Sequence, residues 1–245
     1  MQNLTPALAE IEWHDGQPYA SAFQDVYFSS DNGMLETEYV FLQGNDLYHR
    51  WPQLDTDSFT IAETGFGTGL NFLCASKLWL STASENAVLH FISTEKYPLS
   101  MQDITTALRL WPELHTLSEP LITQYEQLIN GIEIMLYDHR VRLSLLIGDA
   151  TECLSNINPN KVGNEINAWF LDGFSPAKNP EMWQSGLFKQ MARLSNHATT
   201  FATFTSAGDV RRGLSVAGFE ISKQPGFGKK REMLTGRFAG NQSAA

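Results

Sequence analysis

Residues 62–70 read AETGFGTGL, a glycine-rich turn between an apolar run at 59–62 and a segment of helical pattern that begins at Leu70. Because glycine has no Cβ, Gly65, Gly67 and Gly69 let the backbone turn sharply and approach a ligand closely. The start of the following helix offers unpaired N–H groups and a partial positive charge. The order strand, turn, helix predicts a ligand site here, although dinucleotide sites use the same device and a merely well-packed turn is the alternative.

Outward from this turn, the chain alternates short apolar runs with segments of helical spacing. Near-continuous apolar runs are typical of strands buried on both faces, and their alternation with helices predicts one doubly wound α/β domain. Helix signals include Ser100 before Asp103 as a capping box, and Asn179-Pro180 as a cap and first-turn pair. We therefore expect a mostly parallel, seven-stranded sheet flanked by helices, with strands at 59–62, 88–94, 141–147, 168–171, 199–205, 219–221 and 232–238.

Two segments depart from this alternation. The first 50 residues carry an alternating segment at 11–13, a turn at Asp15-Gly16 and an extended stretch at 25–28, which predict a small β-appendage. Residues 132–136 and the strand from Val141 onward are expected to form a hairpin. The predicted organisation is an N-terminal β-appendage over 1–50, packed on a main domain over 51–245.

Composition excludes several classes of protein. The chain has 245 residues, of which 42% are apolar, which is enough for one sizeable core. No run of 18 apolar residues occurs, and the N-terminus lacks a basic region followed by an apolar stretch, so we expect a cytoplasmic protein without a membrane segment. Cys74 and Cys153 stand in no metal-ligand spacing, so neither a disulfide scaffold nor a metal site is expected.

Acidic residues at the predicted strand ends distinguish between ligand classes. Glu63 lies two residues before the first glycine, where a negative charge would gain nothing beside a pyrophosphate but would attract an ammonium or a sulfonium. Glu95 ends the second strand, where a carboxylate binds ribose hydroxyls. Asp149 follows the third, where it accepts a hydrogen bond from an adenine amino group. Together they predict an S-adenosylmethionine pocket and make a nicotinamide dinucleotide the poorer fit.

A second polar turn, Leu171 to Lys178 (LDGFSPAK), follows the fourth strand of the predicted sheet, beside the same edge. Asp172 is placed to accept a hydrogen bond from an amine and take its proton, so that the nitrogen lone pair faces a methyl group. The alternative is that Asp172 only caps the following loop. Phe174 is expected either to stack on a substrate ring or to fill the core.

Six stretches of the chain carry a family resemblance. ETGFGTGLNFL (63–73), WFLDGFSPAKNPEMW (169–183), FTSAGDVRRGL (204–214) and GFGKKREML (226–234) closely resemble the methyltransferase domain of the MnmC family, as do DVYFS (25–29) and ETEYVFLQGN (36–45). The resemblance covers almost the whole chain in order. It implies a class I, Rossmann-like methyltransferase fold. It also implies an enzyme that methylates the amine of 5-aminomethyl-2-thiouridine at the tRNA wobble position, giving 5-methylaminomethyl-2-thiouridine.

The usual members of that family continue into an FAD-dependent oxidase domain that acts on the preceding precursor. These 245 residues contain no second glycine-rich fingerprint, so we expect no FAD site within them. The resemblance leaves open whether the chain is a single-function enzyme or one domain of a bifunctional protein.

Charge is distributed unevenly and suggests where tRNA binds. The formal net charge is −10, but residues 171–245 hold 10 Lys and Arg against 5 Asp and Glu. Two interpretations of the basic residues in 171–245 are open: they form ordinary solvated surface, or they contact phosphates. The resemblance favours phosphate contacts with the tRNA anticodon loop. The candidates are Lys178, Arg211, Arg212, Lys229, Lys230 and Arg231.

Two other functions stay open at this point. A nicotinamide-dependent oxidoreductase uses a similar glycine-rich turn, although Glu63 and the lack of an evident hydride-transfer partner weaken that hypothesis. A non-catalytic RNA-binding module could retain the same fold. Cofactor binding separates the first alternative from a methyltransferase, and methyl transfer to tRNA separates the second.

Overall fold

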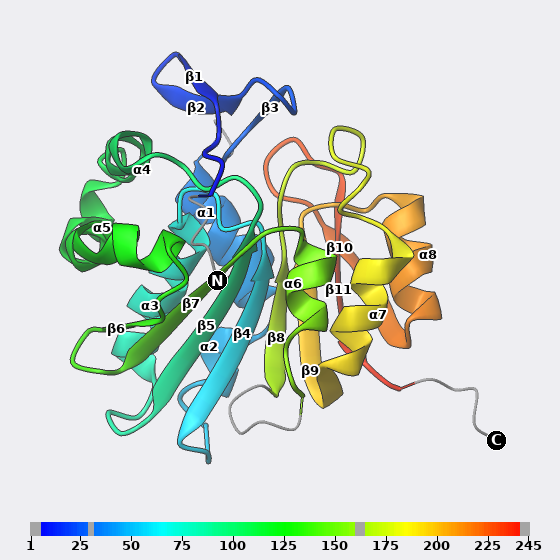
Figure 1. The fold of residues 1–245 in the computed structure, drawn as a ribbon. Coiled ribbons are helices and arrows are strands. Elements are labelled where there is room, and N and C mark those ends of the chain that lie inside the picture. The colour runs from blue at the N-terminus through cyan, green and yellow to red at the C-terminus, as the bar shows by residue number, and fades with distance from the viewer. Residues whose placement is uncertain (1–5, 29–31, 160–164, 241–245) are drawn as a thin grey trace.

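The computed structural model describes residues 6–28, 32–159 and 165–240, which form a central sheet with helices on both faces (Figure 1). The sheet has eight strands in the order β10-β11-β9-β8-β4-β5-β7-β6. Five neighbours, β9, β8, β4, β5 and β7, are parallel, and the other pairings are antiparallel. The strands are β4 (Ser58–Thr64), β5 (Val88–Glu95), β6 (Ile134–Leu136), β7 (Val141–Ile147), β8 (Ile166–Leu171), β9 (Ser195–Thr203), β10 (Phe219–Pro225) and β11 (Glu232–Phe238).

The expected fold class is confirmed, and the number of strands differs by one. All seven expected runs are strands. The eighth is β6, the hairpin partner expected at 132–136, which pairs antiparallel with β7 and extends the sheet at its edge. The hairpin turn passes through three residues of positive φ, Tyr137, Asp138 and His139.

Alternating residues of the central strands bury themselves in two separate cores. In β8, Ala168 and Phe170 belong to one cluster, and Trp169 and Leu171 belong to the other. This period of two is what a strand covered on both faces requires. The first core also takes residues from α3 (Leu70–Thr82), α4 (Met101–Leu108), the 3-10 turn η2 (Pro112–Leu114) and α5 (His115–Ile129), and the second from α6 (Ala150–Ser155), α7 (Ser185–Arg193) and α8 (Gly208–Val216).

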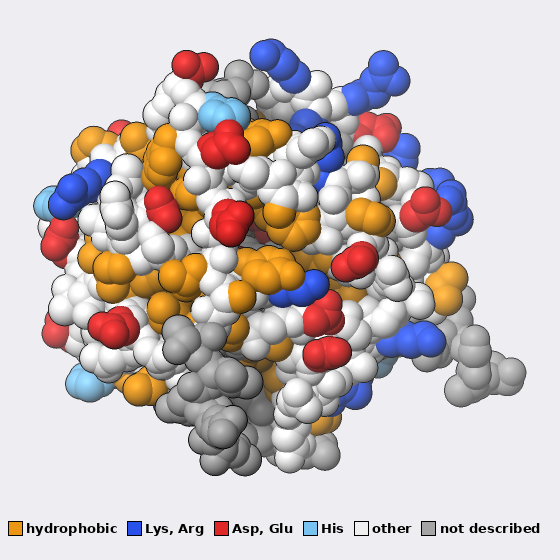
Figure 2. All heavy atoms as spheres, turned by 45° about the horizontal axis from the view of Figure 1, so that its top comes forward, with side chains coloured by type: hydrophobic (Ala, Val, Ile, Leu, Met, Phe, Trp, Pro, Cys, Tyr) orange, Lys and Arg blue, Asp and Glu red, His pale blue; other side chains and the backbone are white. Residues whose placement is uncertain are grey.

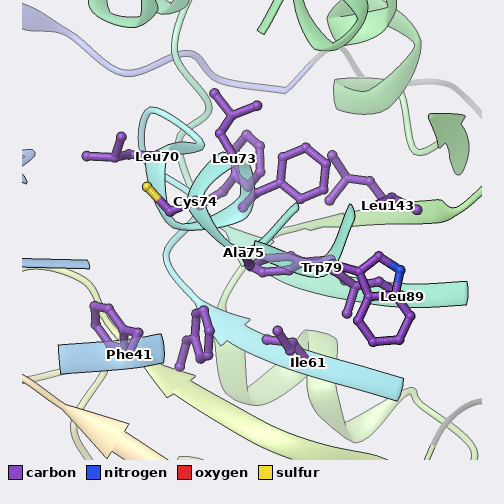
Figure 3. Packing of buried hydrophobic residues seen from close by; sticks show 14 of the residues in the cluster. Phe41, Ile61, Leu70, Leu73, Cys74, Ala75, Trp79, Leu89 and Leu143 are labelled. Atoms are coloured by element: carbon purple, nitrogen blue, oxygen red, sulfur yellow. The ribbon is translucent and has the colours of Figure 1, made fainter. Parts of the chain in front are cut away.

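The first core is dense in large side chains. Figure 3 shows Leu73 and Trp79 of α3 among the packed side chains, together with Ile61 and Leu89 of the sheet. Trp51, Trp79 and Phe91 are fully buried. The indole rings of Trp51 and Trp79 meet edge to face at 5.1 Å, a favoured geometry for aromatic pairs.

The N-terminal segment is only partly the β-appendage expected over residues 1–50. A three-stranded sheet does form, from β1 (Ile11–His14), β2 (Gln17–Ala20) and β3 (Asp25–Val26). Residues 33–50 are instead helical, as α1 (Gly33–Thr37), the π-helix η1 (Glu38–Gln43) and α2 (Leu47–Arg50). Their apolar positions follow a helical period, and they are buried in the first core, whereas strand alternation stops at β3.

Phe41 of η1 tests whether this helical segment is part of the main core. It is 3% exposed and stacks on Phe170 of β8 at 5.2 Å. Replacing Phe41 with alanine leaves a cavity, so we expect the free energy of unfolding to fall by about 3–5 kcal/mol. Urea denaturation measures it, with Leu35→Ala as the control, because Leu35 lies on neighbouring α1 and is 49% exposed. A loss below about 1 kcal/mol for Phe41→Ala would place the segment outside the cooperative core.

Candidate active site

A cavity of about 720 Å³ opens where β4, β5, β7 and β8 end, at the point where the sheet order reverses on either side of β4. In open α/β sheets this is where ligands bind. The turn that follows β4 forms part of the wall through Gly65 and Gly67. Gly69 does not line the cavity and directly precedes α3.

Gly65 is required by its conformation and by its neighbour. Its φ is +81°, a region that favours glycine, and a Cβ at this position would lie 3.1 Å from Cα of Gly173. The N–H groups of Gly65 and Phe66 both donate to the Thr94 carbonyl at the end of β5. The turn is thus held between the ends of β5 and β8.

Glu95, the last residue of β5, lies on the cavity wall and holds the turn in place. Its Oε2 accepts the N–H of Gly67, and its Oε1 accepts that of Tyr97, each at 2.9 Å. Burial raises the pKa of Glu95, while the backbone N–H groups around it lower the pKa. Glu95 lines the cavity at the place where ribose hydroxyls are expected.

Asp149 follows the end of β7 and is the N-cap of α6. Its Oδ1 accepts the N–H groups of Thr151 and Glu152 at 2.9 and 3.2 Å, so it begins α6 as an N-cap while it also lines the cavity. Gly65, Gly67, Glu95 and Asp149 therefore line one cavity from three neighbouring strand ends.

Glu63 lies elsewhere than the sequence suggests. It is 1% exposed and is not among the residues that line the cavity. Its Oε1 accepts Nδ2 of Asn71 at 2.9 Å, and its Oε2 accepts Oγ of Ser93 at 2.6 Å. Because β4 alternates its side chains, Glu63 points into the protein behind the turn, and burial raises its pKa well above the usual value. Direct contact of Glu63 with a ligand stays a prediction without support from this geometry.

Asp172 follows β8 and lines the same cavity. Its Oδ2 accepts Nδ2 of Asn71 at 2.6 Å, and its Oδ1 accepts the N–H of Gly173 at 2.8 Å. Burial raises the pKa of Asp172 to about 6, although these two donors act in the opposite direction. Near neutral pH this carboxylate is therefore ionised but sits close to its point of protonation, which suits a group that accepts a proton.

Phe174 lies on the cavity wall and belongs to neither core cluster. Its ring stacks on Phe23 at 4.5 Å and meets Tyr27 edge to face at 5.4 Å. Asp25 accepts the N–H of Ser175 at 3.1 Å, so the segment carrying β3 is tied to the loop that follows Asp172. Phe174 is thus available at the cavity rather than used to fill the core.

The basic candidates do not gather at one place. Lys230 lines the cavity, with its Nζ 2.6 Å from Oε1 of Glu36 and 4.2 Å from the ring centroid of Phe204. Lys229, Arg231 and Lys178 are exposed outside the cavity lining. Arg211 and Arg212 instead line a second, open groove beside α8 and β10.

Viewed toward the cavity end of the sheet, the surface has an acidic and apolar middle (Figure 2). Most of its Lys and Arg side chains lie on the right, the side on which α7, α8 and β9–β11 lie in Figure 1. In the described part of the chain, no group of three or more His, Cys, Asp or Glu could hold a metal ion. None of the described helices combines the length and apolarity needed to cross a membrane.

Sequence comparison places the chain among known proteins. The profile of a family described as S-adenosyl-L-methionine-dependent methyltransferase matches residues 112–239, just over half of the chain. The chain belongs to this family. In an S-adenosyl-L-methionine-dependent methyltransferase, the cavity with its strand-end acids is the expected cofactor site. The nicotinamide-dependent alternative is not favoured.

Curated relatives are longer than this methyltransferase chain. It is 52% identical, over 97% of its length, to the tRNA 5-methylaminomethyl-2-thiouridine biosynthesis bifunctional protein MnmC of Methylobacillus flagellatus. The protein of the same name from Chromobacterium violaceum is 51% identical over 96% of the chain. The chain covers 36% and 35% of these two proteins, about a third of their length.

A solved structure supports the methyltransferase fold. The crystal structure of MNMC2 from Aquifex aeolicus superposes with a TM-score of 0.72, covering 96% of this chain and 72% of that one, at 20% sequence identity. At this identity the likeness concerns the fold alone. It agrees with the expected class I, Rossmann-like arrangement.

The cavity fits the family's cofactor. Its volume of about 720 Å³ lies in the range of small-molecule sites. The glycine turn brings backbone close to the ligand, and Glu95 and Asp149 offer acceptors for ribose hydroxyls and an adenine amino group. We expect these residues to hold S-adenosylmethionine, whose sulfonium supplies an activated methyl group.

Sequence reasoning missed several residues of this site. Asn71 on α3 contacts both Glu63 and Asp172, and Phe23 and Glu36 line the cavity. The signal for Asn71 was an uncharged polar residue within the apolar run LNFLCA, directly after the glycine turn. Phe23 and Glu36 gave no local signal, because tertiary packing brings them from the N-terminal segment to the cavity.

Proposed function

We propose that this chain transfers a methyl group from S-adenosylmethionine to the primary amine of 5-aminomethyl-2-thiouridine at the tRNA wobble position, giving 5-methylaminomethyl-2-thiouridine. The observation that carries the proposal is Asp172, a half-buried carboxylate on the wall of the cavity shared with Glu95 and Asp149. The names of the curated relatives support the same modification. The resemblance of the six sequence stretches extends to the turn that holds Asp172.

The chain's own residues then have defined tasks. Asp172 accepts an N–H hydrogen bond from the amine and takes up the proton, so that the nitrogen lone pair is directed at the methyl carbon. The N–C bond forms as the S–C bond breaks, and S-adenosylhomocysteine leaves. Phe174 stacks on the uracil ring, which leaves its place in the anticodon loop at low cost because the loop is single-stranded. Alignment in a pocket shielded from water provides most of the acceleration.

Methyl transfer to isolated tRNA tests the proposal. The purified chain is incubated with S-adenosylmethionine and tRNA that carries 5-aminomethyl-2-thiouridine, and the nucleosides are analysed by mass spectrometry. The expected product is 5-methylaminomethyl-2-thiouridine. Normal tRNA affinity without any methylated nucleoside would instead support a non-catalytic RNA-binding module, and binding of NADH but not S-adenosylhomocysteine would support an oxidoreductase.

We further propose that exposed Lys178, Lys229, Arg231, Arg211 and Arg212 contact tRNA phosphates, while Lys230 serves the cavity rim through Glu36. Phosphate contacts release counterions, so tRNA affinity is expected to fall steeply as salt is raised. Binding is expected to be weak overall because the chain is acidic, with a net charge of −10.

The double substitution Lys229→Ala/Arg231→Ala tests this interface. Loss of two phosphate contacts is expected to weaken tRNA binding roughly 3- to 30-fold at low salt and to reduce the slope of log affinity against log salt by about 0.7 per residue. Filter binding over a salt series measures both. Lys223→Ala is the matched control on the same hairpin, since Lys223 is already paired with Glu232 at 2.7 Å. An unchanged slope in the double variant would remove these residues from the interface.

A further inference from the structure

The side chain of Asn71 connects two acids, Asp172 on the cavity wall and Glu63 behind it. Its Nδ2 donates to Oε1 of Glu63 at 2.9 Å and to Oδ2 of Asp172 at 2.6 Å, and its Oδ1 accepts Oγ of Thr37 at 2.7 Å. Carboxylate oxygens accept hydrogen bonds, so the amide nitrogen must face the two acids. The threonine hydroxyl on the other side then fixes the amide plane. Asn71 is 8% exposed, and its bonds leave it little freedom to turn.

We propose that Asn71 is a positioning residue for methyl transfer, which fixes the carboxylate of Asp172 toward the methyl acceptor by bridging it to the buried Glu63. This rests on the proposed function, in which Asp172 meets the amine. Each oxygen of Asp172 has one donor from the protein, Asn71 or the N–H of Gly173, and their remaining lone pairs are left for a substrate N–H.

An asparagine suits this position for electrostatic reasons. Its neutral amide donates two N–H groups to two acids without adding charge. An aspartate there would put a third carboxylate beside Glu63 and Asp172, and a lysine would place a fixed cation next to the expected site of a sulfonium. The sequence-based role of Glu63 changes accordingly. In this proposal Glu63 accepts a hydrogen bond from the Asn71 amide behind the cavity wall and holds that amide in place.

The groups around Asp172 determine how the loss of Asn71 changes the pKa of Asp172. Burial raises the pKa of Asp172, and Glu36 from α1 acts in the same direction. The N–H of Gly173, the amide of Asn71 and the ammonium of Lys230 lower it. Glu63 on β4 lies across the amide as a further acid. Removing the Asn71 donor therefore moves the pKa of Asp172 upward, and activity needs a higher pH.

The experiment compares Asn71→Ala and Thr37→Val with the unmodified chain. Carboxyl ¹³C NMR follows the titration of Asp172, assigned with Asp172→Asn, and kcat is measured over the same pH range with saturating tRNA. We expect the Asp172 midpoint to rise by about one to two pH units in Asn71→Ala, because the ionised carboxylate loses a charge-assisted hydrogen bond. A smaller rise is expected in Thr37→Val, which frees the amide to turn. The acidic limb of the kcat profile should move by the same amount.

Two controls separate positioning from other roles. Asn45→Ala removes another buried asparagine, bonded to the carbonyls of Phe41 and Trp169, and should leave the Asp172 midpoint unchanged. Calorimetric titration with S-adenosylhomocysteine should give a Kd within about threefold of the unmodified chain for Asn71→Ala and Thr37→Val.

An unmoved Asp172 midpoint in both variants would overturn the inference. A large loss of S-adenosylhomocysteine affinity with an unmoved midpoint would make Asn71 a cofactor-binding residue instead. If Asn71→Ala does not fold, Thr37→Val decides, because it keeps the amide and removes only its anchor. The NMR titration needs no turnover, so the midpoint can shift even if the unmodified chain fails to methylate tRNA. That result would refute the proposed function alone.

Discussion

Replacing Asp172 with asparagine is expected to lower kcat for methyl transfer by about 10²- to 10⁴-fold, the usual contribution of a positioned general base. The amide cannot take a proton from the substrate amine. It also sets an N–H group against either the Asn71 amide or the N–H of Gly173, both of which now donate to the carboxylate. Single-turnover kinetics with saturating tRNA and S-adenosylmethionine measure the effect.

Cofactor binding should survive the Asp172→Asn change, because Glu95 and Asp149 lie at other strand ends of the same cavity. We expect the Kd of S-adenosylhomocysteine to change by less than about threefold. Glu181→Gln is the matched control, an exposed acid on the cavity lining that is expected to keep near-normal turnover. Loss of cofactor affinity in Asp172→Asn, with turnover otherwise recoverable at high cofactor, would reassign Asp172 to the cofactor site.

Glu95→Ala is expected to weaken S-adenosylhomocysteine binding by about 100-fold or more. In the proposed site the variant loses the expected acceptor for two ribose hydroxyls. Hydrogen bonds to a charged group contribute about 1.5–3 kcal/mol each, and about 1.4 kcal/mol corresponds to a tenfold change in affinity. The variant also leaves the N–H groups of Gly67 and Tyr97 without their carboxylate, which loosens the glycine turn. Isothermal titration calorimetry measures the change.

Glu152→Ala is the control for Glu95→Ala. Glu152 is an exposed acid on α6 that does not line the cavity, so its removal lowers the negative charge equally without touching the site. Its Kd should stay within about twofold. If both variants lose affinity alike, the general negative field rather than the Glu95 carboxylate holds the cofactor, and the strand-end interpretation is wrong for this residue.

Local sequence was most informative where the chemistry is local. The glycine turn, the strand before it and the helix after it lie within 25 residues, from Ser58 to Thr82, and were readable from spacing alone. Glu95, Asp149 and Asp172 could be placed because parallel strands end at one sheet edge, so a residue at a strand end has a known location. The sequence predicts the hairpin of β6 and β7. The sheet has eight strands instead of the expected seven because β6 joins its edge.

The sequence is less informative where side-chain direction or distant packing decides the place of a residue. The sequence predicts Glu63 at the ligand, and this contact stays a prediction, because in β4 the side chain of Glu63 bonds Asn71 and does not line the cavity. A shift of one residue in a strand reverses the face on which a side chain lies. The sequence predicts the segment 33–50 as part of the β-appendage, whereas the structure shows helices. Their burial against Phe170 and its neighbours is not visible in a local pattern. The basic candidates are similar in character, yet Lys230 lines the cavity while Arg211 and Arg212 line a separate groove.

The amino-acid sequence by itself determined the layered α/β fold, the glycine turn and the set of acids at the strand ends, because periodicity and strand order act over short stretches of chain. Only the tertiary structure decided which of those acids face the cavity, that Asn71 joins two of them, and that Phe23, Glu36 and Lys230 close around the same space. These contacts join residues up to 194 positions apart, as in the pair Lys230 and Glu36. Their partners are selected by packing of the whole domain, which no local pattern encodes.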